Sequence, residues 1–258
     1  MTDTVNYATE GAVAVIAMNR PDSLNGFTAG LCGDLLECFE RADADDGVRV
    51  VVFTGEGRAF SAGADLKAGV EGARNVRGKL LYEYQPVLTA IEQIPKPVIA
   101  AVNGFAAGIG LSFALHCDLV IMADDAFLLS PFSTISLVPD GGANWQLVRQ
   151  LGYRRAYELA VEAQRIGADR CFELGLVNRI APAARLRAEA LAWAGELAGR
   201  APLSLAATKK AMRAAMDQDW ASCYRLEAEL QQQLHASSDA REGVDAFLNK
   251  RPPRFEGK

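Results

Sequence analysis

The chain has 258 residues, of which 50% are hydrophobic and 23% are charged, and its formal net charge is −5. This length and composition allow one large domain with a full hydrophobic core, and they exclude bulk disorder. The negative net charge argues against general binding to nucleic acid or to an anionic membrane surface.

The N-terminal segment MTDTVNYATEG has neither a cationic region nor an apolar run, so it does not predict a signal or transit peptide. The longest uncharged apolar stretch, residues 97–115, is interrupted by Asn103 and by glycines, which makes it a poor membrane-spanning candidate. The five cysteines form no CxxC pair, and His116 and His235 are the only histidines. We therefore expect a cytoplasmic protein without a disulfide framework or a metal site.

Short apolar runs rich in β-branched residues predict strands along the first half of the chain. They are almost continuous rather than alternating, which is typical of strands buried on both faces of a sheet. The four runs are VAVIAM at 13–18, VRVVVFTG at 48–55, PVIAAVNG at 97–104 and LVIMA at 119–123.

Helical patterns lie between these strands. Apolar residues recur every four positions after Thr28, which is a suitable N-cap. A second pattern covers residues 80–91, where Pro86 is expected to kink or divide the helix. Further helices are predicted to begin near Gly108 and after Asp140. This alternation predicts an α/β fold.

The strand signal ends near residue 180, and four helices are predicted beyond it. They cover 183–200, 202–217, 219–236 and 239–249, the last with a possible Asp239-x-x-Glu242 capping box. We therefore predict an α/β core over residues 1–195 and a helical region over 196–258. The apolar stripes of this region serve either as core or as cover for a neighbouring subunit.

Two glycine-rich loops follow predicted strands, RAFSAGADLK at 58–67 and AVNGFAAGIG at 101–110. Each has a simple structural explanation: a surface turn for the first, and tight strand–helix packing for the second. Each loop can also present backbone N–H groups to a ligand. Two such N–H groups, one from each loop, would stabilise an oxyanion or enolate without any charged side chain.

Asp140 is the only ionisable residue in SPFSTISLVPDGGANW, residues 130–145. Its position before two glycines suits an N-cap of the following helix. A carboxylate in an apolar cleft also suits a general base. The sequence leaves both roles open, and the surrounding motifs favour the second.

These motifs, in the order RAFSAGADL, PVIAAVNGFAAGIG, CDLVIMADDAFLLSPFSTISLVPDGGANW and ADRCFELGLVNRI, closely resemble the crotonase (enoyl-CoA hydratase/isomerase) superfamily. The resemblance covers essentially the whole chain. It implies a spiral of ββα units, a C-terminal helical assembly region, a homotrimer or dimer of trimers, and a coenzyme A thioester substrate.

The resemblance also implies roles for individual residues. The oxyanion-hole N–H groups would belong to Ala64 and Ile109, although the family usually has glycine at the second position. The adenine pocket would involve Ala62, Asp65 and Leu66, with Lys67 near the CoA phosphates. We expect Asp65 to fix its loop rather than to take part in catalysis. The remaining candidates for the acyl site are Gly108, Ser112, Phe132 and Trp145, for which core packing or a structural role is the alternative.

The catalytic carboxylates are where this sequence departs from typical hydratases. Two glutamates are usual there, and Ser112 and Phe132 stand at the matching positions. Asp140 stands where dienoyl-CoA isomerases, ring-opening isomerases of phenylacetate catabolism and an aryl-CoA dehalogenase carry a functional aspartate. Hydration requires activation of water and delivery of a proton, usually by a carboxylate pair, whereas one carboxylate is enough to move a proton between carbons.

We therefore expect an enoyl-CoA or ring-opening isomerase that uses Asp140 as its base, without a cofactor other than the CoA of the substrate. Three alternatives remain: an enoyl-CoA hydratase, a CoA thioester hydrolase or dehalogenase with Asp140 as nucleophile, and a non-catalytic or RNA-binding member. The acidic composition counts against RNA binding, and the intact loops count against a silent scaffold.

Overall fold

The computed structural model describes residues 4–68 and 75–258. The first three residues of the acidic N-terminal segment therefore lie outside the described residues. Within the described part of the chain, no helix is long and apolar enough to cross a membrane.

A six-stranded sheet forms one half of the core. Its strands, in spatial order, are β1 (Val5–Glu10), β2 (Val13–Met18), β3 (Val50–Gly55), β5 (Val98–Val102), β7 (Leu119–Ala123) and β10 (Arg179–Ala181). Only the edge strand β1 is antiparallel to its neighbour. Every residue of β2 and β5 is buried, because helices cover both faces of the sheet. The four strands predicted from apolar runs are confirmed.

A smaller four-stranded sheet completes the core, in the order β4 (Ala59–Ser61), β6 (Phe105–Ala107), β8 (Phe127–Leu129) and β9 (Ile166–Gly167). Each of β3, β5 and β7 in the large sheet is followed by one strand of the small sheet. The chain thus winds as a spiral of ββα units, and the predicted α/β class is confirmed. The loops that follow β4 and β6 lie side by side, because these two strands pair in parallel.

The helices of the core are α1 (Ala29–Ala44), α2 (Val76–Lys79), α3 (Gln85–Gln93), α4 (Ile109–His116), α5 (Ala143–Leu151), α6 (Tyr153–Glu162) and α7 (Ala168–Glu173), with 3₁₀ turns at Pro21–Ser23, Phe132–Ile135 and Ala183–Arg185. Thr28 caps α1 as predicted, since its hydroxyl accepts the N–H of Leu31. A π-helical turn, Leu80–Tyr84, joins α2 to α3 just before Pro86. Pro86 is the second residue of α3 and follows helical residues, so the helix is interrupted by a π-helical turn before the proline rather than divided at it.

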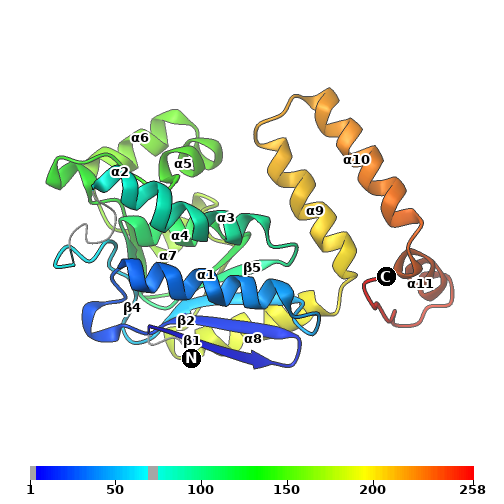
Figure 1. Cartoon of the computed structure of the whole chain (residues 1–258). Helices are drawn as coiled ribbons and strands as arrows, with labels where there is room; N and C mark the ends of the chain where they lie inside the picture. Colours follow the sequence, from blue (N-terminus) through cyan, green and yellow to red (C-terminus); the bar gives the residue numbers. More distant parts are fainter. Residues whose placement is uncertain (1–3, 69–74) are drawn as a thin grey trace.

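Four helices follow the last strand: α8 (Leu186–Ala198), α9 (Pro202–Ala215), α10 (Trp220–His235) and α11 (Ser238–Leu248). Helix α8 packs on the large sheet, whereas α9 and α10 form a pair that projects from the core (Figure 1). Neither α9 nor α10 contains a buried residue.

The start of α11 differs from the predicted capping box. Ser237 is the N-cap, and its hydroxyl accepts the N–H of Ala240. The carboxylate of Asp239 instead accepts the N–H groups of Glu256 and Gly257, both at 2.8 Å. Asp239 therefore holds the C-terminal tail against α11, because a buried carboxylate requires donors and the tail supplies two.

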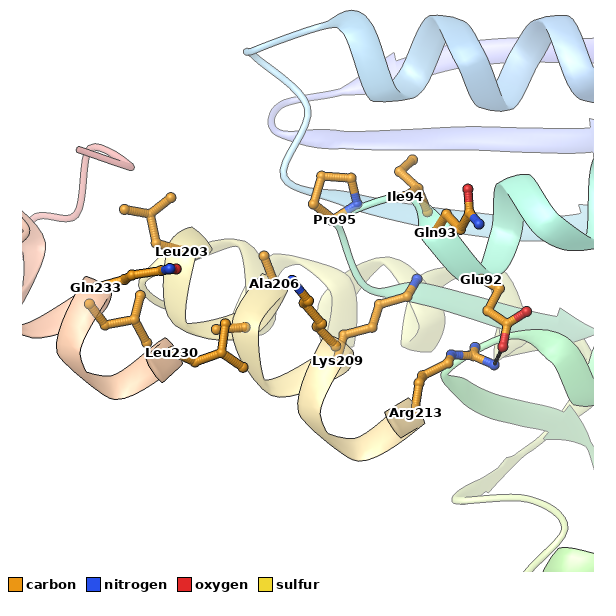
Figure 2. A pocket seen from close by; sticks show the side chains of 13 residues that line it. Glu92, Gln93, Ile94, Pro95, Leu203, Ala206, Lys209, Arg213, Leu230 and Gln233 are labelled. Atoms are coloured by element: carbon orange, nitrogen blue, oxygen red, sulfur yellow. Dashed lines mark ion pairs between the residues drawn. The ribbon is translucent and has the colours of Figure 1, made fainter. Parts of the chain in front are cut away.

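A pocket of about 680 Å³ lies between the end of α3 and the pair α9–α10. Figure 2 shows Lys209 and Arg213 of α9 pointing towards the core, with Arg213 paired to Glu92 at 3.7 Å. Asp118 fixes the same helix through Lys209 and Arg213, each at 2.8 Å. The second half of α9 is therefore anchored to the core by ion pairs, while large apolar side chains on the helices that follow it remain uncovered.

We predict that these uncovered side chains are buried in a homotrimer or a dimer of trimers. Trp220 is 78% exposed and Phe247 is 83% exposed, and large apolar side chains gathered at one end of a chain mark an interaction surface. Light scattering at micromolar concentration should give three or six times the subunit mass of 27.7 kDa. A monodisperse monomer would contradict this prediction. Truncation at about residue 200 should abolish assembly and leave an aggregating core.

Candidate active site

The first loop holds the backbone of Ala64 in a fixed orientation. Phe27 donates its N–H to the carbonyl of Gly63 at 2.8 Å, and its own carbonyl accepts the N–H of Asp65 at 3.0 Å. These bonds flank Ala64 in a parallel bridge, so the N–H of Ala64 points away from Phe27. Among the described residues nothing accepts it. Ala64 therefore presents a free donor at the protein surface.

Hydrogen bonds made by the side chains of Ser61 and Asp65 fix this loop. Ser61 Oγ accepts the N–H of Gly63 at 3.1 Å and donates to the carbonyl of Asn25. Asp65 pairs with Arg20 at 3.0 Å and accepts the N–H groups of Lys67 and Ala68. The hydrogen bond from Arg20 lowers the pKa of Asp65, so this carboxylate stays ionised and acts as a loop-fixing acceptor.

The other ligand-binding candidates of this loop lie towards solvent. Leu66 is 77% exposed and Lys67 is also exposed, whereas Ala62 is half-buried with its N–H bonded to the carbonyl of Leu24. All three lie within three residues of Ala64. Their predicted role in holding the CoA portion of a substrate stays a prediction.

The second loop ends at Gly108, which has φ +55° and precedes the first residue of α4. Its N–H donates to the carbonyl of Leu129, and no side chain caps the helix. The N–H of Ile109 therefore has no acceptor among the described residues, as expected for the first turn of a helix. A Cβ atom on Gly108 would lie 3.7 Å from the Cα of Gly63. The two loops are thus in contact, which brings both predicted donors to one place.

The turn that contains Asp140 lies against the same helix. Ser112 Oγ donates to the Asp140 carbonyl at 2.8 Å. Gly141 has φ +58°, and a Cβ atom there would overlap Ile109 Cδ1. A Cβ atom on Gly142 would lie 2.7 Å from His116 Cε1. Because positions 109, 112 and 116 share one face of α4, the glycine pair lets the turn lie directly on that face, next to the second donor.

The carboxylate of Asp140 does not cap the following helix. Helix α5 begins at Ala143 after Gly142, and no side-chain cap bond is present. The N-cap alternative is therefore wrong. The Oδ1 atom of Asp140 is buried and has no hydrogen-bond partner among the described residues. Burial raises the pKa of this carboxyl group to about 6, as desolvation disfavours the charged form.

The remaining predicted residues divide between this site and other places. Phe132 is buried, and its ring tip would lie 3.8 Å from a Cβ atom on Gly108, so it borders the second loop. Trp145 is half-buried on α5, where the Arg149 guanidinium lies 5.6 Å from its ring centre. Arg149 in turn pairs with Asp217, so the recorded contact of Trp145 is with this exposed ion pair.

Tyr84 is a residue of the site that the sequence analysis missed. Its ring packs edge-on against Phe27 at 5.9 Å and Phe113 at 6.4 Å, and it is only 2% exposed. Its hydroxyl has no partner among the described residues. Burial raises the pKa of this phenol, and the negative charges of Asp140 and Glu83 add to the effect. Its helical spacing with Leu80 and Leu88 indicated only a core position; the polar tip on this apolar stripe was the available signal.

The His116 ring packs against Gly142 in the Asp140 turn, and its charge is not among the causes that shift the pKa of Asp140. Its Nδ1 lies 3.0 Å from the carbonyl of Ser112, and burial lowers the pKa of the ring. Arg213 of α9 donates to the backbone carbonyl of His116 at 2.7 Å. Among the described residues no three His, Cys, Asp or Glu side chains are grouped so that they could hold a metal ion.

The chain is similar to known proteins in both sequence and structure. The profile described as Enoyl-CoA hydratase/isomerase matches residues 8–258. A Rhodobacter capsulatus protein named "Probable enoyl-CoA hydratase" is 40% identical over 99% of this chain and 98% of its own. An Escherichia coli protein named 1,2-epoxyphenylacetyl-CoA isomerase is 36% identical over 96% and 97%. The crystal structure of an enoyl-CoA hydratase from Bacillus anthracis superposes with a TM-score of 0.94 at 31% identity, covering 99% of this chain and 100% of that one.

Proposed function

Because the chain belongs to the enoyl-CoA hydratase/isomerase family, we propose that it is an acyl-CoA isomerase that works through an enolate. The substrate is a CoA thioester whose acyl group contains a double bond or a strained ring. One observation carries this proposal: Asp140, whose buried Oδ1 atom has no hydrogen-bond partner, lies in a turn that packs on Ile109, and the loop before Ile109 contacts the loop of Ala64, the other residue with a free backbone N–H.

The two N–H groups give the site its electrophilic part. The thioester oxygen accepts hydrogen bonds from Ala64 and Ile109, which withdraws electron density from the carbonyl and acidifies the adjacent carbon. When a proton leaves that carbon, its electron pair moves to the oxygen, where both donors are already in place. Backbone donors need no protonation change, so this part of the site works at any pH at which the protein is folded.

Asp140 supplies the base. A group with a pKa of about 6 is mostly ionised at neutral pH and is a stronger base than an ordinary aspartate. It accepts the proton from one carbon and returns it to another, so the double bond moves or the ring opens without a net change in protonation. Neither a metal nor a redox cofactor enters this scheme, and CoA arrives as part of the substrate.

The environment of Asp140 also supports isomerisation over hydration. The resemblance places the two glutamates of typical hydratases at Ser112 and Phe132. Ser112 Oγ is committed to the carbonyl of Asp140, and Phe132 has no polar group. A hydratase nevertheless remains the second candidate, since the R. capsulatus relative carries that name.

A panel of CoA thioesters tests the proposal. Wild-type protein should isomerise an enoyl-, dienoyl- or epoxyacyl-CoA and should exchange substrate α- or γ-protons with deuterated water. Hydration of crotonyl-CoA, followed by the loss of enoyl absorbance, should be slow or absent, because no carboxylate pair activates the water. Crotonyl-CoA turnover near 100 per second, which is typical of a fast enzyme, would instead establish the hydratase.

A further inference from the structure

Several unpartnered polar atoms belong to residues on the segments that border the proposed site. Five buried side-chain polar atoms lack a hydrogen-bond partner in the described part of the chain, and they belong to Tyr7, Glu83, Tyr84, Ser130 and Asp140. Ser130 follows the residue whose carbonyl accepts the N–H of Gly108. Native proteins pair nearly all such groups, so exceptions on segments that border one site indicate that a ligand supplies the missing partners.

Tyr84 is held between the supports of both loops. Phe27 fixes the Ala64 loop through two backbone hydrogen bonds, and Phe113 lies on α4, the helix that begins at Ile109. The ring of Tyr84 contacts both phenylalanines. The phenol is therefore positioned by rigid core packing, which is what a residue that selects a ligand requires.

The phenol is a donor that the thioester does not use. Burial and the nearby charge of Asp140 raise its pKa, so the hydroxyl keeps its proton. The thioester oxygen already has two donors, Ala64 and Ile109. A third donor, held between the supports of the two loops, thus calls for a second acceptor in the substrate.

We infer that the Tyr84 hydroxyl determines specificity by donating a hydrogen bond to an oxygen atom of the acyl group. The inference rests on the proposed function of the Asp140 site and narrows its substrate class to acyl-CoA thioesters with a hydroxyl, epoxide or keto oxygen near the reacting carbon. A hydroxyl would also donate to Asp140, whereas an epoxide or ketone would only accept from Tyr84. An unsubstituted acyl chain leaves the phenol without a partner.

Equilibrium binding tests the inference without requiring turnover. Calorimetry compares butyryl-CoA, 3-hydroxybutyryl-CoA and acetoacetyl-CoA, with ligand recovery checked after each titration. Wild-type protein should bind at least one oxygenated ligand about tenfold or more tightly than butyryl-CoA, because a site built for a polar group rejects its absence. If 3-hydroxybutyryl-CoA and acetoacetyl-CoA both bind more tightly than butyryl-CoA, the ligand oxygen only accepts a hydrogen bond from Tyr84. If 3-hydroxybutyryl-CoA alone binds more tightly, its hydroxyl also donates a hydrogen bond to Asp140.

The variant Tyr84→Phe should remove this preference and leave the affinity for butyryl-CoA within about twofold. Tyr7→Phe is the matched control, since Tyr7 carries another buried, unpartnered hydroxyl but lies on β1 with Arg41 over its ring. It should change none of the three affinities. The preference of the wild-type protein for oxygenated ligands is measured without any variant. The inference can therefore be refuted even if Tyr84→Phe does not fold.

Two results would overturn the inference. One is equal affinity of the wild-type protein for all three ligands, and the other is an equal loss of affinity for all three ligands in Tyr84→Phe. Failure of the proposed function has a different signature. An Asp140→Asn protein that kept isomerase activity would refute the base, while the ligand preference and its dependence on Tyr84 would remain.

Discussion

Asp140→Asn lowers isomerisation about 10²- to 10⁴-fold, the usual contribution of a positioned acid–base group. The substitution keeps the size of the side chain, and the backbone carbonyl that Ser112 holds is unchanged. Exchange of substrate protons with deuterated water should collapse together with turnover. In the wild-type protein, activity should fall as the pH drops below about 6, because protonation removes the base.

The same variant should be more stable than the wild type above pH 6. The pKa of Asp140 rises from 3.8 to about 6 on folding, so its ionisation opposes folding. The free energy of unfolding of the wild type therefore decreases by roughly 3 kcal/mol as the pH rises from about 4 to 6, because Asp140 ionises. Asparagine does not ionise, so the variant does not show this decrease. Urea unfolding at several pH values measures the difference.

Asp219→Asn is the matched control for this charge change. Asp219 caps α10 by accepting the N–H groups of Ala221 and Ser222, and its carboxylate bonds only residues of the exposed helix that it caps. Its replacement should leave turnover unchanged. A folded Asp140→Asn protein with wild-type turnover and exchange would exclude Asp140 as the base.

Ile109→Pro should lower turnover about 10²- to 10³-fold, because it deletes one of the two oxyanion donors. Proline is tolerated at the first position of a helix, where Ile109 lies, so α4 should still form. Steady-state kinetics on the preferred thioester measures the loss, with circular dichroism as a check of folding.

Ile109→Ala separates the donor from the side chain. It removes the Ile109 contact with the Gly141 turn but keeps the backbone N–H. A small loss in Ile109→Ala with a large loss in Ile109→Pro supports the backbone donor. Equal kinetics in folded Ile109→Pro and wild-type proteins would place the oxyanion hole elsewhere.

The sequence predicted the parts of the fold that depend on local patterns. Buried parallel strands require continuous apolar runs, and those of β2, β3, β5 and β7 were visible without tertiary information. The cap at Thr28 followed from residue type and position alone. Motif order was enough to place Ala64 and Ile109 on loops that the structure brings into contact.

Tertiary contacts decided what the sequence could not. Asp140 and Asp239 both had the local pattern of a cap, but neither carboxylate caps a helix. The carboxylate of Asp239 accepts from donors 17 and 18 residues away, and the buried Oδ1 atom of Asp140 has no partner among the described residues. Tyr84 was indistinguishable from a core residue, because its neighbours Phe27 and Phe113 are distant in sequence.

The backbone path of the turn on α4 does not depend on the catalytic side chain that the turn carries. Ser112 holds residue 140 by its main-chain carbonyl, and the two glycines that follow set the path of the backbone. Neither of these contacts uses the carboxylate of Asp140. Evolution can therefore exchange the residue there without rebuilding the scaffold, so that a new reaction becomes accessible through one codon while folding is preserved.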